Sequence, residues 1–124
     1  MVRSFLFALS LVVVLAFSAC GSVCTGTSCA CPSGQTCTFD TCNAQTQSCN
    51  FDCASDSTCT GTCGASCRVT CAGKACTVSA GAGSNVACTA GTCTITCNGA
   101  CSVASTATLT LTCNGSTKGT AGCE

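Results

Sequence analysis

The sequence contains no histidine, tryptophan or tyrosine, and charged side chains make up only 6% of its 124 residues. General acid–base catalysis near neutral pH usually depends on histidine or on a carboxylate with a tuned pKa. The acidic residues are Asp40, Asp52, Asp56 and Glu124. Because there is no histidine and there are only these four carboxylates, we predict that the protein is not an enzyme and has no catalytic residues.

The spacing of the four acidic residues matches neither an EF-hand loop nor the glycine-rich calcium-binding nonapeptide.

Basic side chains are equally scarce. They are Arg3, Arg68, Lys74 and Lys118. Nucleic-acid binding needs a basic surface, usually with aromatic platforms on which bases stack. The composition therefore predicts that no nucleic acid is a partner.

Long hydrophobic stretches are absent apart from one N-terminal run. The segment from Phe5 to Phe17 reads FLFALSLVVVLAF and follows Arg3. A bilayer-spanning helix needs about 20 apolar residues, and this run is shorter. A basic residue, a short apolar run and then the small residues Ser18 and Ala19 form the pattern of a secretory signal peptide. Residues 1–19 are predicted to be that signal peptide.

The end of this segment resembles the lipobox of bacterial lipoproteins. In Ala16-Phe17-Ser18-Ala19-Cys20-Gly21, a large apolar residue and two small ones precede a cysteine. The resemblance implies cleavage before Cys20, lipidation of Cys20 and anchoring to a membrane. The alternative is ordinary cleavage after Ser18, which would give a soluble extracellular protein. Cysteine parity favours lipidation, because 19 − 1 leaves 18 cysteines, an even number that can pair completely.

Cysteine is the residue that the chain has in excess. Its 19 cysteines are the composition of a disulfide scaffold that is exported to an oxidising compartment. No C-x-x-C pair, the usual element of zinc ribbons and thioredoxin-like sites, occurs, and the one C-x-C is Cys29-Ala30-Cys31. This spacing is also far less dense in cysteine than a metallothionein, so we predict no metal site and no cofactor.

Several cysteine pairs spaced by four positions enclose one apolar residue. In an extended chain, residues i, i+2 and i+4 share a face. The segments are Cys49-Phe51-Cys53, Cys67-Val69-Cys71 and Cys93-Ile95-Cys97, and Leu109-Leu111-Cys113 continues the pattern. We predict strands with one buried face, joined by turns at Ala72-Gly73, Asn98-Gly99 and Asn114-Gly115.

An internal repeat links these segments. CRVTCAGKAC from Cys67 aligns with CTITCNGAC from Cys93, so that Cys71 and Cys97 become equivalent inward positions on stacked strands. Units that cannot close a core alone are expected to stack. The predicted fold is all-β, a small disulfide-rich β-solenoid-like repeat scaffold, and the alternative is an irregular disulfide-stapled β meander or sandwich.

The domain prediction separates a tether from the repeat. Residues 20–47 fit the repeat poorly and are expected to be a lipid-anchored, loop-rich tether or cap, whereas residues 48–124 form the cysteine-rich β-repeat domain. The candidate structural disulfide cysteines are Cys49, Cys53, Cys67, Cys71, Cys76, Cys88, Cys93, Cys97, Cys101 and Cys113.

The repeat resembles those of cell-envelope lipoproteins from soil bacteria, notably myxobacteria, in which C-x-V-x-C and G-x-x-C units recur. The resemblance spans about Cys49 to Cys113 and implies architecture and location without an activity. A weaker likeness to insect antifreeze solenoids comes from TCT triplets that begin at Thr36, Thr58 and Thr92. The triplets are far apart and unequally spaced, whereas a flat threonine array requires a strict short repeat, so ice binding is kept only as an alternative.

Together these features predict a non-catalytic, lipid-anchored structural or interaction lipoprotein of the bacterial cell envelope. Its partners would be the membrane, through the lipid, and an unknown protein or glycan surface. The alternative is a soluble secreted disulfide-rich effector, inhibitor or ice-binding protein.

Overall fold

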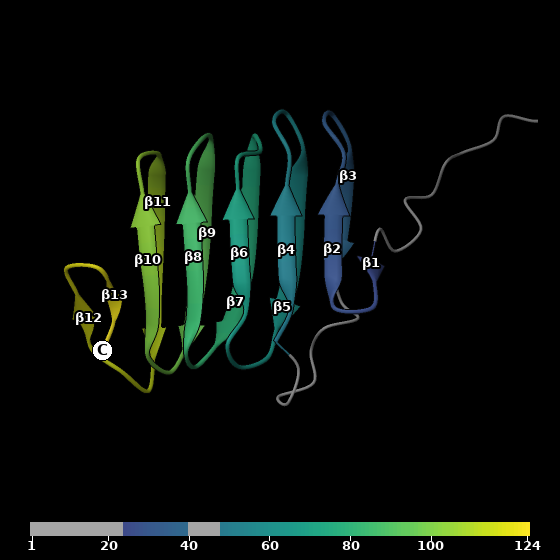
Figure 1. Ribbon diagram of the computed structural model, residues 1–124. Coiled ribbons are helices and arrows are strands. Elements are labelled where there is room, and N and C mark those ends of the chain that lie inside the picture. The colour runs from purple at the N-terminus through teal and green to yellow at the C-terminus, as the bar shows by residue number, and fades with distance from the viewer. Residues whose placement is uncertain (1–23, 40–47) are drawn as a thin grey trace, which may run out of the picture.

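The computed structural model describes residues 24–39 and 48–124, and these residues form strands and turns without any helix. This part of the chain therefore has no helix that could cross a bilayer. The strands make two sheets that face each other (Figure 1). The chain alternates between the sheets, so each coil adds one strand to each wall. The fold is the predicted all-β, disulfide-rich β-solenoid.

An eight-stranded sheet forms one wall. Its middle strands run parallel, and antiparallel strands cover both ends. In spatial order the strands are β1 (Cys24–Thr25), β2 (Ser28–Cys31), β4 (Asn50–Cys53), β6 (Arg68–Cys71), β8 (Ser84–Cys88), β10 (Cys101–Ser105), β13 (Gly122–Cys123) and β12 (Lys118–Gly119). The end strands occupy edges that would otherwise offer unpaired backbone groups to another sheet.

A five-stranded sheet, parallel throughout, forms the opposite wall. In spatial order its strands are β11 (Thr108–Asn114), β9 (Thr92–Asn98), β7 (Ala75–Gly81), β5 (Thr58–Cys63) and β3 (Thr36–Phe39). Neighbouring strands are aligned without slippage, as Thr60 pairs with Thr77 and Thr77 with Thr94. Equivalent residues of successive coils therefore lie side by side.

Every second residue of a strand fills the space between the walls. In β9, Cys93, Ile95 and Cys97 are buried, whereas Thr94 between them is exposed. The same alternation holds in β4 and β6, so the predicted strands and their inward faces are confirmed. In β11 the inward residues are only half-buried, because β11 is an edge strand of its sheet.

The largest interior side chains belong to one ring pair. Phe39 and Phe51 face each other from opposite walls with ring centroids 4.7 Å apart. Gly61 lies beside them, and a Cβ atom at that position would stand 3.0 Å from Cβ of Phe39 and 3.1 Å from Cε2 of Phe51. Glycine at position 61 therefore leaves the room that the two rings occupy.

Disulfides close the bends at which the chain passes between the walls. At the upper bend of Figure 1, where the chain leaves the eight-stranded sheet, bridges stack on successive coils. These bridges are Cys31–Cys37, Cys53–Cys59, Cys71–Cys76 and Cys88–Cys93. The lower bend, where the chain returns, carries Cys97–Cys101 and Cys113–Cys123.

The predicted period of the repeat is wrong. Cys71 pairs in register with Cys88, so one coil runs from Cys71 to Cys88, whereas Cys97 lies on the other wall and pairs with Ala80 and Cys113. The alignment of Cys71 with Cys97 therefore spanned about one and a half coils. It matched a strand of one wall to a strand of the opposite wall, because both walls present the same cysteine–aliphatic–cysteine pattern to one interior.

The solenoid also begins earlier in the chain than the tether prediction placed it. Strands β2 and β3 lie within residues 24–39, and they pair in parallel with β4 and β5. The sequence between Phe39 and Asn50 is longer than the link between Cys63 and Arg68 at the same bend. Because of this longer link, the cysteine spacings of the first coil differ from those of the later coils, and a comparison of spacings alone does not detect it.

We expect the joint substitution Cys88→Ala and Cys93→Ala to lower the free energy of unfolding by about 2 kcal/mol, because it removes one upper bridge that closes a short loop and leaves no unpaired thiol. Chemical denaturation monitored by circular dichroism measures this loss. The control Thr94→Ser changes an exposed neighbour and should cost under about 0.5 kcal/mol. Equal losses in the two proteins would contradict the assignment of inward and outward residues.

Candidate functional site

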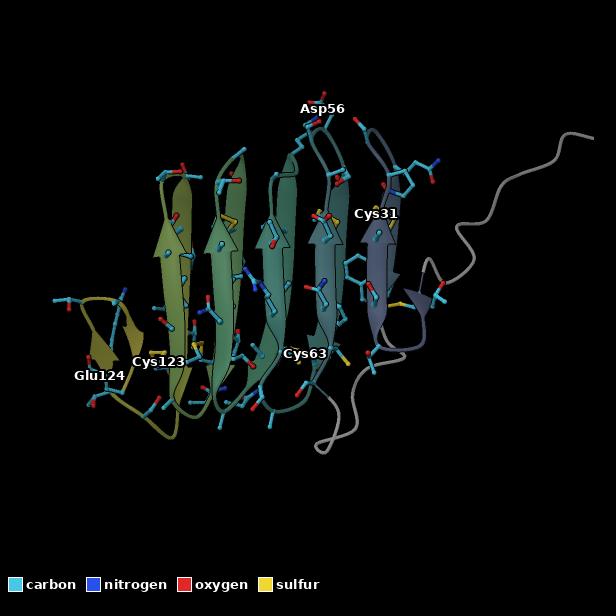
Figure 2. The ribbon with its side chains drawn as sticks, viewed as in Figure 1. Cys31, Asp56, Cys63, Cys123 and Glu124 are labelled. Carbon is cyan, nitrogen blue, oxygen red and sulfur yellow. A yellow bond between two sulfur atoms is a disulfide. The ribbon has the colours of Figure 1, made fainter. Side chains whose placement is uncertain are left out.

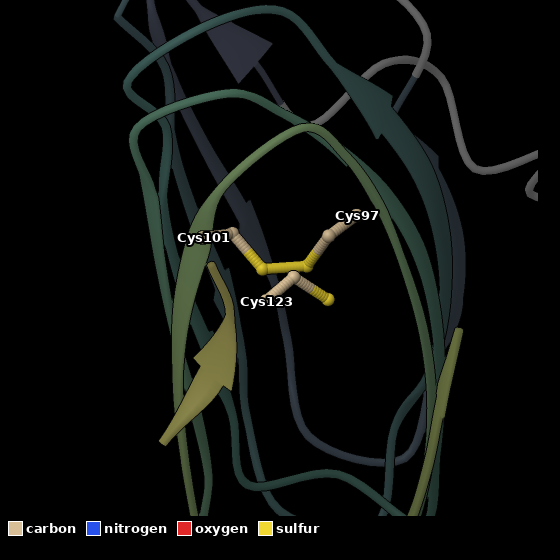
Figure 3. Close-up of side chains that lie close together, drawn as sticks. All are labelled: Cys97, Cys101 and Cys123. Atoms are coloured by element: carbon tan, nitrogen blue, oxygen red, sulfur yellow. A yellow bond between two sulfur atoms is a disulfide. The ribbon is translucent and has the colours of Figure 1, made fainter. Parts of the chain in front are cut away.

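One group of three sulfur atoms has the geometry of a possible metal site. The Sγ atoms of Cys97, Cys101 and Cys123 lie within 4.8 Å of one another, and all three residues are buried (Figure 3). Soft metal ions bind thiolates, but Cys97 is bonded to Cys101 and Cys123 is bonded to Cys113. In this oxidised state the group offers no thiolate, and its role is to fill and cross-link the interior.

The structure places the candidate disulfide cysteines as follows. Cys67 is a buried thiol, and so is Cys63, which sequence reasoning did not select. The other candidates are disulfide-bonded, namely Cys49, Cys53, Cys71, Cys76, Cys88, Cys93, Cys97, Cys101 and Cys113. Bridged cysteines that sequence reasoning left out are Cys24, Cys29, Cys31, Cys37, Cys59 and Cys123. The lipidation candidate Cys20 lies outside the described residues.

A simple rule would have found the missed bridges. Each disulfide whose two partners lie in the described residues joins cysteines that are consecutive in the sequence. The reason is geometric, because each bend reverses the chain within a few residues and brings the last inward residue of one strand against the first of the next. So many bridges indicate an oxidising environment outside the cytoplasm.

Acidic side chains do not converge in the described part of the chain. Asp52 is exposed on β4, Asp56 lies at the upper bend, and Glu124 lies at the opposite end of the solenoid (Figure 2). A surface hollow of about 400 Å³ includes Glu124, and its other lining residues carry no charge. Asp40 lies outside the described residues. Among residues 24–39 and 48–124, no two carboxylates lie together as a pair for acid–base chemistry.

The outer side of the five-stranded sheet carries threonine side chains in a regular arrangement. Its outward positions form three columns that run across the strands, and we call this surface the threonine face. The first column is Thr36, Thr58, Ala75, Thr92 and Thr108. The second is Thr38, Thr60, Thr77, Thr94 and Thr110. The third is Thr62, Ser79, Thr96 and Thr112.

The spacing within the threonine face follows from strand geometry. Neighbouring strands lie about 4.8 Å apart, and residues i and i+2 of one strand lie roughly 6.7 Å apart. The χ1 angle of threonine is restricted, because two heavy atoms stand on its Cβ atom. Hydroxyl and methyl groups therefore repeat along two directions, along each strand and from strand to strand, and Figure 1 shows little change of direction between neighbouring strands.

Hydrogen bonds hold the margin of this array. Asn98 donates from Nδ2 to Oγ of Ser79 at 2.9 Å, and Asn114 donates from Nδ2 to Oδ1 of Asn98 at 3.1 Å. These contacts link strands β7, β9 and β11 at the end of the third column. They reduce the freedom of the polar groups beside the threonines.

The opposite wall has a different surface. The outward residues of the eight-stranded sheet include the exposed charges Asp52 and Arg68 together with alanine, serine and asparagine. The outward positions of β3, β5, β7, β9 and β11 carry no charge. Because both walls obey the same inward pattern, this difference does not follow from packing of the core.

The argument from sequence spacing against a threonine array is wrong. The TCT triplets at Thr58 and Thr92 lie two coils apart, and the intervening coil supplies Ala75-Cys76-Thr77 in register. The segment between Thr36 and Thr58 includes the longer link after Phe39, and the two triplets still pair. Column order thus survives unequal loops, which sequence spacing alone does not reveal.

Comparison with known proteins adds no assignment to these features. No protein family, curated protein or solved structure matches this chain.

Proposed function

We propose that this chain is a non-catalytic, ice-binding protein and that the threonine face is its binding surface. The observation that carries the proposal is the second column, in which threonine occupies the outward position of every strand of the five-stranded sheet. Ice binding gives a role to the threonine face, whose regular composition is not explained by packing of the core.

The proposal rests first on the match between a regular array of threonine side chains and a crystal lattice. The oxygen atoms on prism faces of ice repeat along two directions at spacings comparable to those of the threonine columns. Ordered waters that bridge protein groups to a ligand are energetically close to direct hydrogen bonds. Threonine hydroxyls and methyl groups at lattice spacing can hold such waters at positions that belong to the ice lattice. Each contact is weak, and the affinity is the sum of many contacts.

Rigidity is the second support. A surface that must be ordered on binding loses conformational entropy, and a preorganised surface does not. Behind the first and second columns lie buried cysteines whose bridges cross the upper bend, including Cys59, Cys76 and Cys93. The strands that carry the threonines are therefore fixed to the opposite wall before any ligand is present.

The chemistry of the face also favours ice over a protein partner. Hot spots of protein–protein interfaces are enriched in tryptophan, tyrosine and arginine, and the outward positions of the five-stranded sheet contain none of them. Charged groups hold their own hydration water, and the described charges lie on the other wall, at the bends or at the C-terminal end. The threonine face is thus uncharged, non-aromatic and regular.

We expect the purified protein to show thermal hysteresis and to inhibit ice recrystallisation, and Thr77→Lys to lose most of both activities. Thr77 lies on the middle strand and in the middle column, so a long charged side chain there interrupts the array at its centre. The matched control is Thr70→Lys, which makes the same change on the outer side of β6 in the opposite wall. It should retain the activity of the wild type.

Circular dichroism and thermal unfolding establish that both variants are folded. A wild-type protein without either activity would overturn the proposal, and so would equal losses in the Thr77→Lys and Thr70→Lys variants. Loss in the second variant alone would place the binding surface on the eight-stranded sheet.

The lipid anchor is a separate proposal and rests on the sequence around Cys20. We propose that the exported protein is held in the bacterial envelope through acylation of this cysteine, with the solenoid presented outside the cytoplasm. The anchor and the ice-binding surface are compatible, because Cys20 precedes the first strand of the stack in the chain. An anchored form would attach the cell surface to ice, whereas a released form would act in the medium.

We expect Cys20→Ser to move the protein from the membrane fraction to the soluble fraction. Burial of an acyl chain contributes about 0.8 kcal/mol per methylene group, so its loss removes most of the membrane affinity. Fractionation followed by intact-mass measurement detects both the location and the missing lipid. Unchanged membrane retention would contradict the anchor, while ice activity measured on the same variant would still test the threonine face.

A further inference from the structure

Two thiols remain in the described interior among the bridged cysteines. Cys63 ends β5 and Cys67 directly precedes β6, so both lie at the lower bend, where Figure 2 labels Cys63. Their side chains are buried, with 4% and 1% of their surface exposed. Both are thiols in this structure.

The register places this pair at the same position as a bridge two coils further along. Cys63 pairs with Ala80, and Ala80 pairs with Cys97. On the other wall the backbone N–H of Cys67 donates to Oγ of Ser84 at 3.1 Å, and Ser84 pairs with Cys101. Successive coils therefore carry Cys63/Cys67, Ala80/Ser84 and Cys97/Cys101 at this bend. The last of these pairs is a disulfide with a sequence separation of four, which is also the separation of Cys63 and Cys67.

The two thiols contact each other. Burial, then a hydrogen bond and charge repulsion from the neighbouring Cys67, raise the pKa of the Cys63 thiol to about 12. The Cys67 thiol in turn donates to the carbonyl oxygen of Gly64 at 3.2 Å. The two buried thiols are therefore held by weak hydrogen bonds at the position where Cys97 and Cys101, two coils further along, are joined covalently.

We propose that Cys63 and Cys67 are the site of a further disulfide, which completes the lower bend in the exported protein. In this reaction both S–H bonds break and one S–S bond forms. The two electrons and two protons pass to a disulfide oxidant such as oxidised glutathione, which is reduced to two thiols. The bridge obeys the rule of the others, because it joins cysteines that are consecutive in the sequence.

A surface groove borders the site on the side of Cys63. The groove has a volume of about 390 Å³, and Cys63, Gly64, Gly81 and Asn98 are among its lining residues. Attack on a disulfide requires the thiolate, and the raised pKa of Cys63 keeps the thiol protonated at neutral pH. Attack by Cys63 on an oxidant is therefore slow at pH 7 in the folded protein and becomes faster as the pH rises. Closure during folding, before the bend is buried, avoids this restriction.

The chain itself supplies a matched variant for the test. The double substitution Cys63→Ala and Cys67→Ser copies Ala80 and Ser84, which occupy the same positions in the next coil. The variant and the wild type are purified from an oxidising compartment and unfolded in denaturant. Each is alkylated with iodoacetamide without reduction and, in a second sample, after reduction, and the intact masses are measured by mass spectrometry. Peptide mapping then identifies the alkylated cysteines.

We expect the wild type to carry no alkyl group on Cys63 or Cys67 before reduction, and to gain one more pair of alkyl groups than the variant after it. A peptide pair linked through these cysteines should appear without reductant. If Cys63 and Cys67 are alkylated before reduction, they are free thiols in the exported protein and the proposal is overturned. If either is linked to another cysteine, the assignment by register is overturned.

Discussion

Disulfide bridges across the two bends hold together an interior that is too thin to be stabilised by apolar side chains alone. A strand such as β9 contributes one aliphatic residue, Ile95, between two cysteines. The bend bridges of the repeat close short loops, so each contributes only about 2 kcal/mol by restricting the unfolded chain. Their stacking has a second effect. It fixes the distance between the two sheets and prevents a strand from shifting its register relative to its neighbours.

This inward constraint leaves the outward surface free to vary. In a strand every second side chain points away from the core, so the outward residues of the two walls are not chosen by packing. On one wall they include Asp52 and Arg68, and on the other most of them are threonine. A regular surface of this kind needs a rigid support, and the bridged cysteines behind Thr77 and Thr94 provide it. The core is therefore a precondition of the proposed ice-binding surface without dictating its composition.

The coils differ in whether a disulfide closes the lower bend, and Cys63 and Cys67 lie at that bend. A coil can carry a bridge at the lower bend, as Cys97–Cys101 does, or small residues, as Ala80 and Ser84 do. Ala80 and Ser84 are buried, so the stack continues through a coil in which no covalent link closes this bend. The solenoid thus tolerates an open coil between closed ones, because parallel pairing to both neighbours still holds the strands.

The sequence by itself determined the strands, their inward faces and the all-β class, because alternation within segments such as Cys93-Ile95-Cys97 is a local property of an extended chain. It also determined that few charges and no histidine are present, which limits the chemistry of any site. Only the tertiary structure decided the length of one coil, since both walls carry the same pattern and cysteine spacings cannot tell one wall from the other. The tertiary structure also decided the threonine face, because strand pairing aligns its columns. Thr38, Thr60 and Thr77 are separated by unequal distances along the chain, and it is parallel pairing that brings them into one column.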